Sequence, residues 1–509
     1  MRQGNRDGVN QTATSPTLDT LFGRILARKP RELALIDPGN KLRITGQTAK
    51  RLTYEQADRA IAALAAHFVD SGLPAHSVIA LQLPNTVELA LTVLAAHRAG
   101  LVVALFPLLW RQAELVAALN RTSARAIVTS ARIDGVAHSE LAMNAAAEAF
   151  SIRHVFGFGS DLPEGMASLD QALAQPSRAT RHVIQDGRKA AIISFDVTSD
   201  GFRAVPRTHL SLIAGGLALS LESDVPQGAT LMSAFAPASF AGLASSVVTW
   251  LLSGGTLAMH HPFEADVLEQ DIREHRCDTL IAPAQLAFRL DELDLDARLP
   301  GLRNVIGMWR APEQVTSSPP WTAQRASLTD AYLFGEAGLF GARRTSDDGT
   351  PALVKPGLHG APRELPGASI SGEILLTPKG TLGLRGPMVA VAAYAPPAPP
   401  ADSLTPQTPR DFVDTEYAAR LDRATGAIAI TAPPSGVLAV GGYRFLAQDL
   451  QEWSKRLGQG ALLTALPDRL SGHRLAGRAQ DNARARDALA ELGLNPLMVE
   501  AFRDRSIVG

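Results

Sequence analysis

Short apolar runs alternate with amphipathic segments through the first two thirds of the chain. Runs such as SVIALQL (77–83), LVVALF (101–106) and RAIVTS (125–130) are almost continuously apolar, which is typical of strands buried on both faces. The segments between them carry apolar residues every three or four positions, which predicts amphipathic helices. This alternation predicts an α/β fold built on doubly wound parallel sheets.

Local signals mark the ends of two of these helices. Thr53 and Gln56 have the spacing of a capping box at the start of TYEQADRAIAALAAHFVDSGL, and Gly72 is placed to end that helix. Asn85 precedes NTVELALTVLAAHRAG and is predicted to cap the next helix with its side chain.

The pattern changes near residue 350. GASISGEILLTPKGTLGLRGP (367–387) has the glycine spacing and β-branched content of hairpins, and residues 394–410 form a Pro-rich connection. We therefore expect a flexible tail over 1–16 and a large domain over 17–432, whose β-rich part covers about 350–432. A small, shortened α+β domain is expected over 436–509.

Charge and composition exclude several classes of function. The 509 residues include 49 Lys and Arg against 50 Asp and Glu, so nothing indicates binding to nucleic acid or to an anionic membrane. No apolar run reaches the ~18 residues of a membrane span, and the N-terminus lacks the apolar core of a secretory signal. These features predict a cytoplasmic protein. The single cysteine, Cys277, cannot form an internal disulfide and is expected to be buried.

One segment suggests a phosphate site. SFDVTSDGFRAVPRTHLSLIAGG (194–216) reads as a strand, a polar loop containing Thr198, Ser199 and Arg203, and a helix, which is the layout of a phosphate-binding loop. Hydroxyl groups and a guanidinium can coordinate phosphate, whereas Asp200 would repel it. An ordinary polar turn is the alternative interpretation.

This loop, the stretch LTYEQ…VVALFP (52–107) and LTDAYLFGEAGLFG (328–341) together resemble the class I adenylate-forming enzymes, over roughly residues 17–475. That family includes acyl-CoA synthetases and aryl-acid ligases. The resemblance implies that Thr198 and Ser199 contact phosphate and that Arg203 steadies it. It also implies that Tyr332 stacks on adenine and that Glu336 holds Mg²⁺, with Arg203 and Glu336 as the catalytic pair. A solvated charge is the alternative for Glu336.

Two further segments fall where this family lines its acid pocket. AFAPASFAGLASS (234–246) offers Phe240, and LRNVIGMWRAPE (302–313) offers Trp309. Both side chains are predicted to line a small carboxylic acid, although a core tryptophan is the alternative for Trp309. The pair His260–His261, near Glu264 and Asp266, is set aside as a metal site because adjacent strand residues point in different directions.

Several positions depart from the family pattern. Tyr417 stands where the family has a ribose-binding Asp, Pro433 stands at an Arg position, Gly436 occupies the domain hinge and Gly335 replaces a Thr. No lysine follows Lys455, although the family uses a C-terminal lysine during adenylation.

Two functions follow. One is an atypical acid ligase that uses ATP and Mg²⁺ and transfers an acyl group to CoA or to the phosphopantetheine thiol of an acyl carrier protein. The other is a catalytically degenerate pseudoenzyme that acts as a binding or scaffold partner of a biosynthetic enzyme. A different reaction in the acid pocket, without ATP, is a third interpretation.

Overall fold

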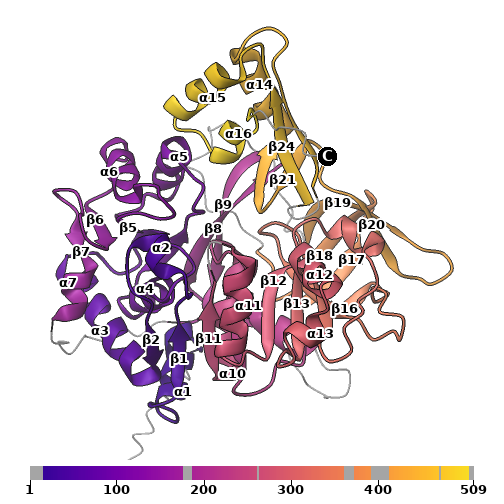
Figure 1. Cartoon of the computed structure of the whole chain (residues 1–509), viewed down its shortest axis with the longest axis horizontal. Helices are drawn as coiled ribbons and strands as arrows, with labels where there is room; N and C mark the ends of the chain where they lie inside the picture. The colour runs from indigo at the N-terminus through magenta and orange to yellow at the C-terminus, as the bar shows by residue number, and fades with distance from the viewer. Residues whose placement is uncertain are drawn as a thin grey trace, which may run out of the picture.

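Two helix-flanked sheets form the larger part of the molecule, and a small C-terminal unit sits across one end of both (Figure 1). This computed structural model describes residues 15–175, 186–260, 263–359, 372–390, 412–468 and 472–503. The α/β class predicted from the alternating pattern is confirmed.

The first sheet has seven strands in the order β7-β6-β5-β3-β4-β8-β9, parallel except for β9. Four of its strands are buried at nearly every residue, which explains their continuous apolar composition. The strands are β3 (Val78–Gln82), β4 (Val102–Leu105), β5 (Ala126–Ser130), β6 (His154–Phe158), β7 (Ala167–Ser168), β8 (Ala190–Thr198) and β9 (Gly201–Thr208). The accompanying helices are α3 (Tyr54–Asp70), α4 (Val87–Arg98), α5 (Gln112–Thr122), α6 (His138–Glu148) and α7 (Leu169–Ala174).

The second sheet has eight strands in the order β15-β14-β13-β12-β10-β11-β1-β2. Its central strands are parallel, so their carboxyl ends meet at one edge. The strands are β1 (Leu33–Ile36), β2 (Arg51–Thr53), β10 (Thr230–Ser233), β11 (Thr256–Met259), β12 (Thr279–Pro283), β13 (Asn304–Trp309), β14 (Ser327–Leu333) and β15 (Leu339–Arg343). The helical segments are α1 (Leu18–Leu26), α2 (Lys41–Thr45), α8 (His209–Glu222), α9 (Phe240–Leu243), the π-helix η1 (Ala244–Val248), α10 (Thr249–Ser253), α11 (Ala265–Glu274), α12 (Ala284–Glu292), α13 (Leu295–Arg298) and the 3₁₀ helix η2 (Pro312–Ser317).

A five-stranded antiparallel sheet follows, made of β16 (Gly357–His359), β17 (Gly372–Leu376), β18 (Thr381–Arg385), β19 (Val413–Leu421) and β20 (Ile428–Ala432). The hairpin predicted in 367–387 is present as β17–β18. The Pro-rich connection at 394–410 lies outside the described residues.

The C-terminal unit has a hydrophobic core of its own, which extends from Val440 to Phe502. It consists of two hairpins and three helices: β21 (Val437–Val440), β22 (Tyr443–Leu446), α14 (Ala447–Arg456), β23 (Leu462–Asp468), β24 (Gly472–Arg478), α15 (Asn482–Glu491) and α16 (Pro496–Glu500). Gly436, which precedes β21, has a left-handed φ of +74°.

Of the two predictions for helix ends, the one for Thr53, Gln56 and Gly72 is confirmed and the one for Asn85 is wrong. Thr53 and Gln56 form the predicted capping box, and Gly72 follows the helix with a φ of +77°. The prediction for Asn85 was wrong. Thr86 is the N-cap residue of α4, and Asn85 Nδ2 donates to the carbonyl of Ser233, at 2.8 Å, instead. The buried Asn85 thereby joins the two large sheets.

Cys277 is fully buried, as predicted. Among the described residues, no helix combines the length and apolar character needed to cross a bilayer. The same residues contain no group of three or more His, Cys, Asp or Glu side chains that could hold a metal ion; His261 lies outside them.

A buried ion cluster links β1 to α4. Lys41 Nζ lies 2.6 Å from Asp37 Oδ2 and 2.7 Å from Glu88 Oε1, with all three side chains almost inaccessible to solvent. Lys50, whose side chain is partly exposed, lies 3.0 Å from the same Glu88 oxygen. The Lys41 ammonium group thus balances most of the negative charge of two buried carboxylates.

Replacing Lys41 with Met is expected to lower the free energy of unfolding by about 3–5 kcal/mol, because Asp37 and Glu88 would be left buried with one cation fewer. Urea denaturation measures this change. The matched control is Arg59→Ala, which breaks an exposed pair with Glu55 and should cost less than about 1 kcal/mol. A similar small loss in the Lys41 variant would show that the cluster does not stabilise the fold.

Candidate functional site

The segment predicted as a phosphate loop is a tight β-hairpin. β8 and β9 pair antiparallel with Thr198 opposite Gly201, so only Ser199 and Asp200 form the turn, and α8 begins after a full second strand. Phe195 and Val197 are residue types that favour extended strands. Gly201, which directly follows the two turn residues, has a φ of +102°, a conformation that glycine adopts readily. A two-residue turn has too few backbone N–H groups to surround a polyphosphate.

The three residues predicted to contact phosphate lie together at this turn. Ser199 Oγ donates to Glu416 Oε1 at 2.9 Å, and Arg203 pairs with Asp200 at the surface. Neither cavity described below is lined by Thr198, Ser199 or Arg203. Their roles toward phosphate stay predictions.

Glu336 follows β14 and is buried against the hairpin. Its Oε2 accepts hydrogen bonds from Ser194 Oγ, at 2.5 Å, and from the Phe240 backbone N–H, at 2.9 Å. Burial raises the pKa of Glu336 to about 7, against the opposing effect of the nearby Arg207 guanidinium. A Mg²⁺ ion would compete with these hydrogen bonds for a carboxyl group that is partly protonated near neutral pH. The predicted magnesium site therefore does not fit the arrangement observed.

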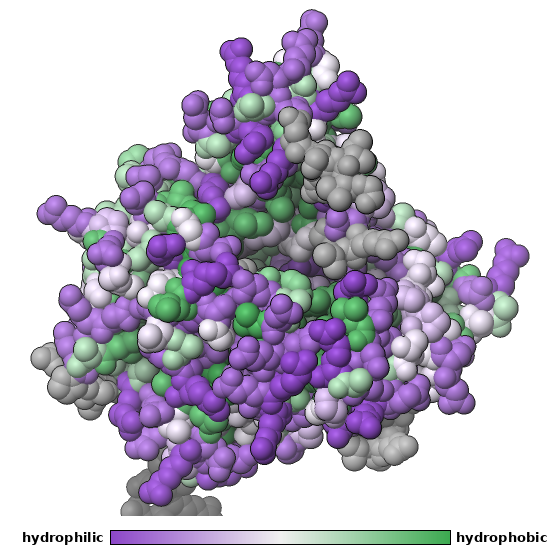
Figure 2. Space-filling model, viewed as in Figure 1, coloured by the Kyte–Doolittle hydropathy of each residue, from purple (hydrophilic) through white to green (hydrophobic). Residues whose placement is uncertain are grey.

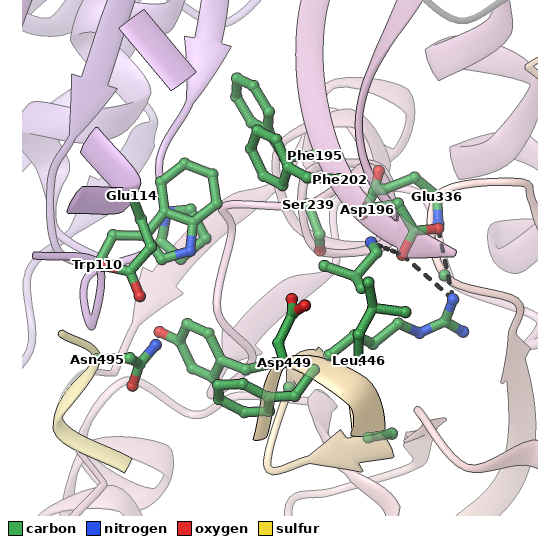
Figure 3. A pocket seen from close by; sticks show the side chains of 18 of the residues that line it. Trp110, Glu114, Phe195, Asp196, Phe202, Ser239, Glu336, Leu446, Asp449 and Asn495 are labelled. Atoms are coloured by element: carbon green, nitrogen blue, oxygen red, sulfur yellow. Dashed lines mark hydrogen bonds and ion pairs between the residues drawn. The ribbon is translucent and has the colours of Figure 1, made fainter. Parts of the chain in front are cut away.

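An ion pair connects the C-terminal unit to this site. Arg444 of β22 lies 3.2 Å from Asp196 Oδ1, while Asp196 Oδ2 accepts from the Glu336 N–H at 2.8 Å (Figure 3). The other end of the Arg444 guanidinium donates to the Tyr417 hydroxyl at 2.8 Å. Although burial opposes it, the carboxylate of Asp196 raises the pKa of Arg444.

Two departures from the family pattern belong to this arrangement. A Cβ at Gly335 would collide with both Asp196 and the Arg444 guanidinium, so the missing side chain makes room for the ion pair. Tyr417 packs edge-on against Phe334 and presents its hydroxyl to Arg444. Gly335 thus leaves room for the Arg444 guanidinium, and Tyr417 accepts a hydrogen bond from it.

A cavity of about 400 Å³ lies between the larger part of the molecule and the C-terminal unit. Trp110, Phe195 and Phe202 form an aromatic wall, with the last two rings stacked at 5.4 Å (Figure 3). Leu446 and Asp449, from the C-terminal unit, face them across the cavity. Figure 2 shows a hollow with hydrophobic residues beneath the C-terminal unit. The walls are mainly apolar, and Asp196, Glu336 and Arg444 form a polar end.

The predicted pocket side chains lie in the core. Phe240 is fully buried with the Arg207 guanidinium 3.6 Å above its ring, and its neighbours Ser239 and Ala241 line the cavity instead. Trp309 Nε1 donates to Asp330 Oδ1 at 2.8 Å, as a core tryptophan would. Tyr332 is buried in β14 and stacks on Phe340 at 4.4 Å. None of the three lines either cavity.

Sequence reasoning missed the residues that organise the site: Ser194, Asp196, Arg207 and Arg444. The Gly441–Gly442 pair before Tyr443 and Arg444 was an available signal, because adjacent glycines mark a tight hairpin turn that projects neighbouring side chains. The partners of Arg444 come from distant parts of the chain, so its contacts had no local signal.

Comparison with known proteins shows which family and which relatives this chain resembles. Residues 22–370 match the profile of the family described as AMP-binding enzyme. The chain is 22% identical over 254 residues to a medium-chain fatty-acid–CoA ligase of Escherichia coli, covering 49% of this chain and 45% of that protein. It is 29% identical over 194 residues to a salicyl-AMP ligase/salicyl-S-ArCP synthetase of Mycobacterium tuberculosis, covering 38% of this chain and 33% of that protein. The aligned segments thus span less than half of either relative.

A solved structure supports the same fold. The amide bond synthetase McbA from Marinactinospora thermotolerans superposes with a TM-score of 0.69 at 16% identity, over 94% of both chains.

Glu336 gives the site a measurable pH dependence. Its pKa is about 7 in the fold and 4.5 for an ordinary glutamate, so the folded protein binds the proton more tightly. The resulting stabilisation is fully present below pH 4.5 and is lost as the pH rises through 7. Glu336→Gln, which stays neutral, should gain stability relative to the wild type between pH 4.5 and 8, by on the order of 3 kcal/mol.

Urea unfolding of both proteins at several pH values measures this difference. The control Glu55→Gln, at an exposed pair, should shift stability by less than about 1 kcal/mol at every pH. A difference between wild type and Glu336→Gln that does not change with pH would mean that folding does not raise the pKa of Glu336.

Proposed function

Because the chain belongs to the AMP-binding enzyme family, we propose that it is an adenylate-forming acid ligase that activates an apolar carboxylic acid with ATP. In this reaction the acid's carboxylate oxygen attacks the α-phosphorus of ATP, and pyrophosphate leaves. An acceptor such as the thiol of CoA or of a carrier protein then attacks the acyl carbon, and AMP leaves with the acyl–oxygen bond electrons.

The 400 Å³ cavity is the observation that carries this proposal. It lies at the carboxyl ends of β13 and β14, where sheets of this type place their ligands, and the C-terminal unit covers it. Its mainly apolar walls and its polar end suit an organic ligand that carries a charged group.

The named activities of the relatives agree with an apolar acid. One relative is a medium-chain fatty-acid–CoA ligase and the other a salicyl-AMP ligase, so both are named for acids with apolar bodies. The second is also named for transfer to a carrier protein, which favours a thiol acceptor here.

In this proposal the turn of the β8–β9 hairpin contacts the phosphates of the nucleotide. Thr198, Ser199 and Arg203 would contact phosphate oxygens once Arg203 leaves its surface pair with Asp200. Arg203 and Arg444 would supply positive charge where negative charge develops. No role toward Mg²⁺ is assigned to Glu336.

One observation favours a second candidate, a binding or scaffold protein that does not adenylate. Asp196, Glu336, Tyr417 and Arg444 satisfy one another, so the polar end of the cavity is filled by side chains of the protein itself. Such a protein would bind the acyl group of a partner enzyme's product and leave ATP unchanged.

Incubation with ATP, Mg²⁺, CoA and either octanoate or salicylate is expected to release pyrophosphate and AMP only when the acid is present. Arg203→Ala should lower this rate at least tenfold, because a charge-assisted contact to phosphate is lost. Arg59→Ala, another exposed arginine in an ion pair, is the matched control and should leave the rate unchanged.

Calorimetric titration with ATP and Mg²⁺ separates the two candidates. Saturable binding weakened by Arg203→Ala supports the ligase. Absence of binding at millimolar ATP, together with absence of AMP from every acid, would exclude the ligase and favour the scaffold protein.

A further inference from the structure

A second cavity, of about 220 Å³, adjoins the first at Arg310. It lies at the carboxyl ends of β12 and β13, and the β21–β22 turn closes it through Gly441 and Gly442. Apart from Arg310, its walls are mainly apolar: Ala234, Phe263, Pro283, Leu286, Met308 and Ala311.

Arg310 is the charged group that both cavities share. Its NH1 donates to the carbonyl of Gly441 at 2.6 Å, and its guanidinium lies 4.0 Å from the centre of the Phe235 ring. Within the described residues, no carboxylate comes within ion-pair distance of Arg310, whereas Arg444 and Arg344 each have one.

Arg310 therefore has no ion-pair partner within the described residues, although Tyr443 and Glu336 interact with its charge from farther away. Burial lowers the pKa of Arg310 to about 10, so the group is still cationic at neutral pH. The ring and the carbonyl fix the plane of the guanidinium but use one of its five N–H donors. A half-buried guanidinium that is held in place and has donors to spare is a receptor for a planar anion.

We propose that Arg310 binds the carboxylate of the acid substrate while the apolar body of the acid occupies the 220 Å³ cavity. This inference rests on the proposed function for the identity of the ligand as a carboxylic acid. The carboxylate is then presented to the larger cavity, which Arg310 also lines. A carboxylate matches the fork of one guanidinium, and apart from Arg310, Gln285 and His473 the walls of this cavity are mainly apolar.

Gly442 has a specific part in this arrangement. A Cβ at that position would lie 2.6 Å from the Arg310 guanidinium carbon, so a bare glycine lets the turn close over the arginine. The C-terminal unit therefore both orients Arg310 and forms a wall of the acid site.

The test measures acid binding without ATP, so that it does not depend on adenylation. Calorimetry compares butanoate, octanoate and salicylate with their neutral amides, using wild type, Arg310→Gln, Arg310→Lys and the control Arg303→Gln. Arg303 is an exposed arginine whose side chain, among the described residues, hydrogen-bonds only to nearby backbone carbonyls. Inorganic phosphate serves as the competing anion.

We expect wild type and Arg303→Gln to bind at least one acid more tightly than its amide, with phosphate unable to compete at equal concentration. Arg310→Gln should weaken acid binding tenfold or more and leave amide binding unchanged, and Arg310→Lys should restore part of the loss. Equal acid affinity in Arg310→Gln, or binding of no acid by wild type, would overturn the inference. If acid binding depends on Arg310 but no AMP forms, the ligase proposal fails and the carboxylate site stands.

Discussion

The ion pair between Asp196 and Arg444 is the interaction on which the arrangement of the site depends. Asp196 belongs to the hairpin of the first sheet, holds the backbone of Glu336 from the second sheet, and pairs with an arginine of the C-terminal unit. Two sheets that share a hydrophobic core and a C-terminal unit with a core of its own thus meet at one carboxylate. Because a buried carboxylate without its cation is costly, each part constrains the position of the others.

Other polar groups extend this connection. Arg207 lies fully buried between the hairpin and the second sheet, where it donates to the carbonyls of Glu336 and Met388. Glu336 in turn joins Ser194 to the N-terminus of α9. These hydrogen bonds satisfy most of the buried polar atoms at this end of the cavity, whereas Arg207 Nε has no hydrogen-bond partner within the described residues.

The sequence predicted the fold well because the fold depends on patterns that are local. Continuous apolar strands, amphipathic helices and a capping box at Thr53 are each readable in a few adjacent residues. The site was predicted less well. Trp309 and Tyr332 were assigned by their place in a motif, but side-chain direction in a buried strand is decided by packing on both faces. Asp196 and Arg444 are 248 positions apart, so their pairing depends on tertiary structure.

The hairpin shows how one local difference alters a predicted site. With a two-residue turn, SFDVTSDGFRAV continues as strand where a longer glycine-rich loop would leave backbone N–H groups free. The same strand geometry places Phe195 and Phe202 side by side and creates the aromatic wall of the larger cavity. The positions that depart from a phosphate-loop pattern therefore present an apolar surface to the cavity.

The walls of both cavities come from two separately packed bodies. Leu446 and Asp449 close the larger cavity, and Gly441 and Gly442 close the smaller one, all from the C-terminal unit. The volume of both cavities is thus a property of the interface, and neither body encloses it alone. Any rotation that separated the two bodies would open both cavities to solvent at once, so access to one cavity is coupled to access to the other.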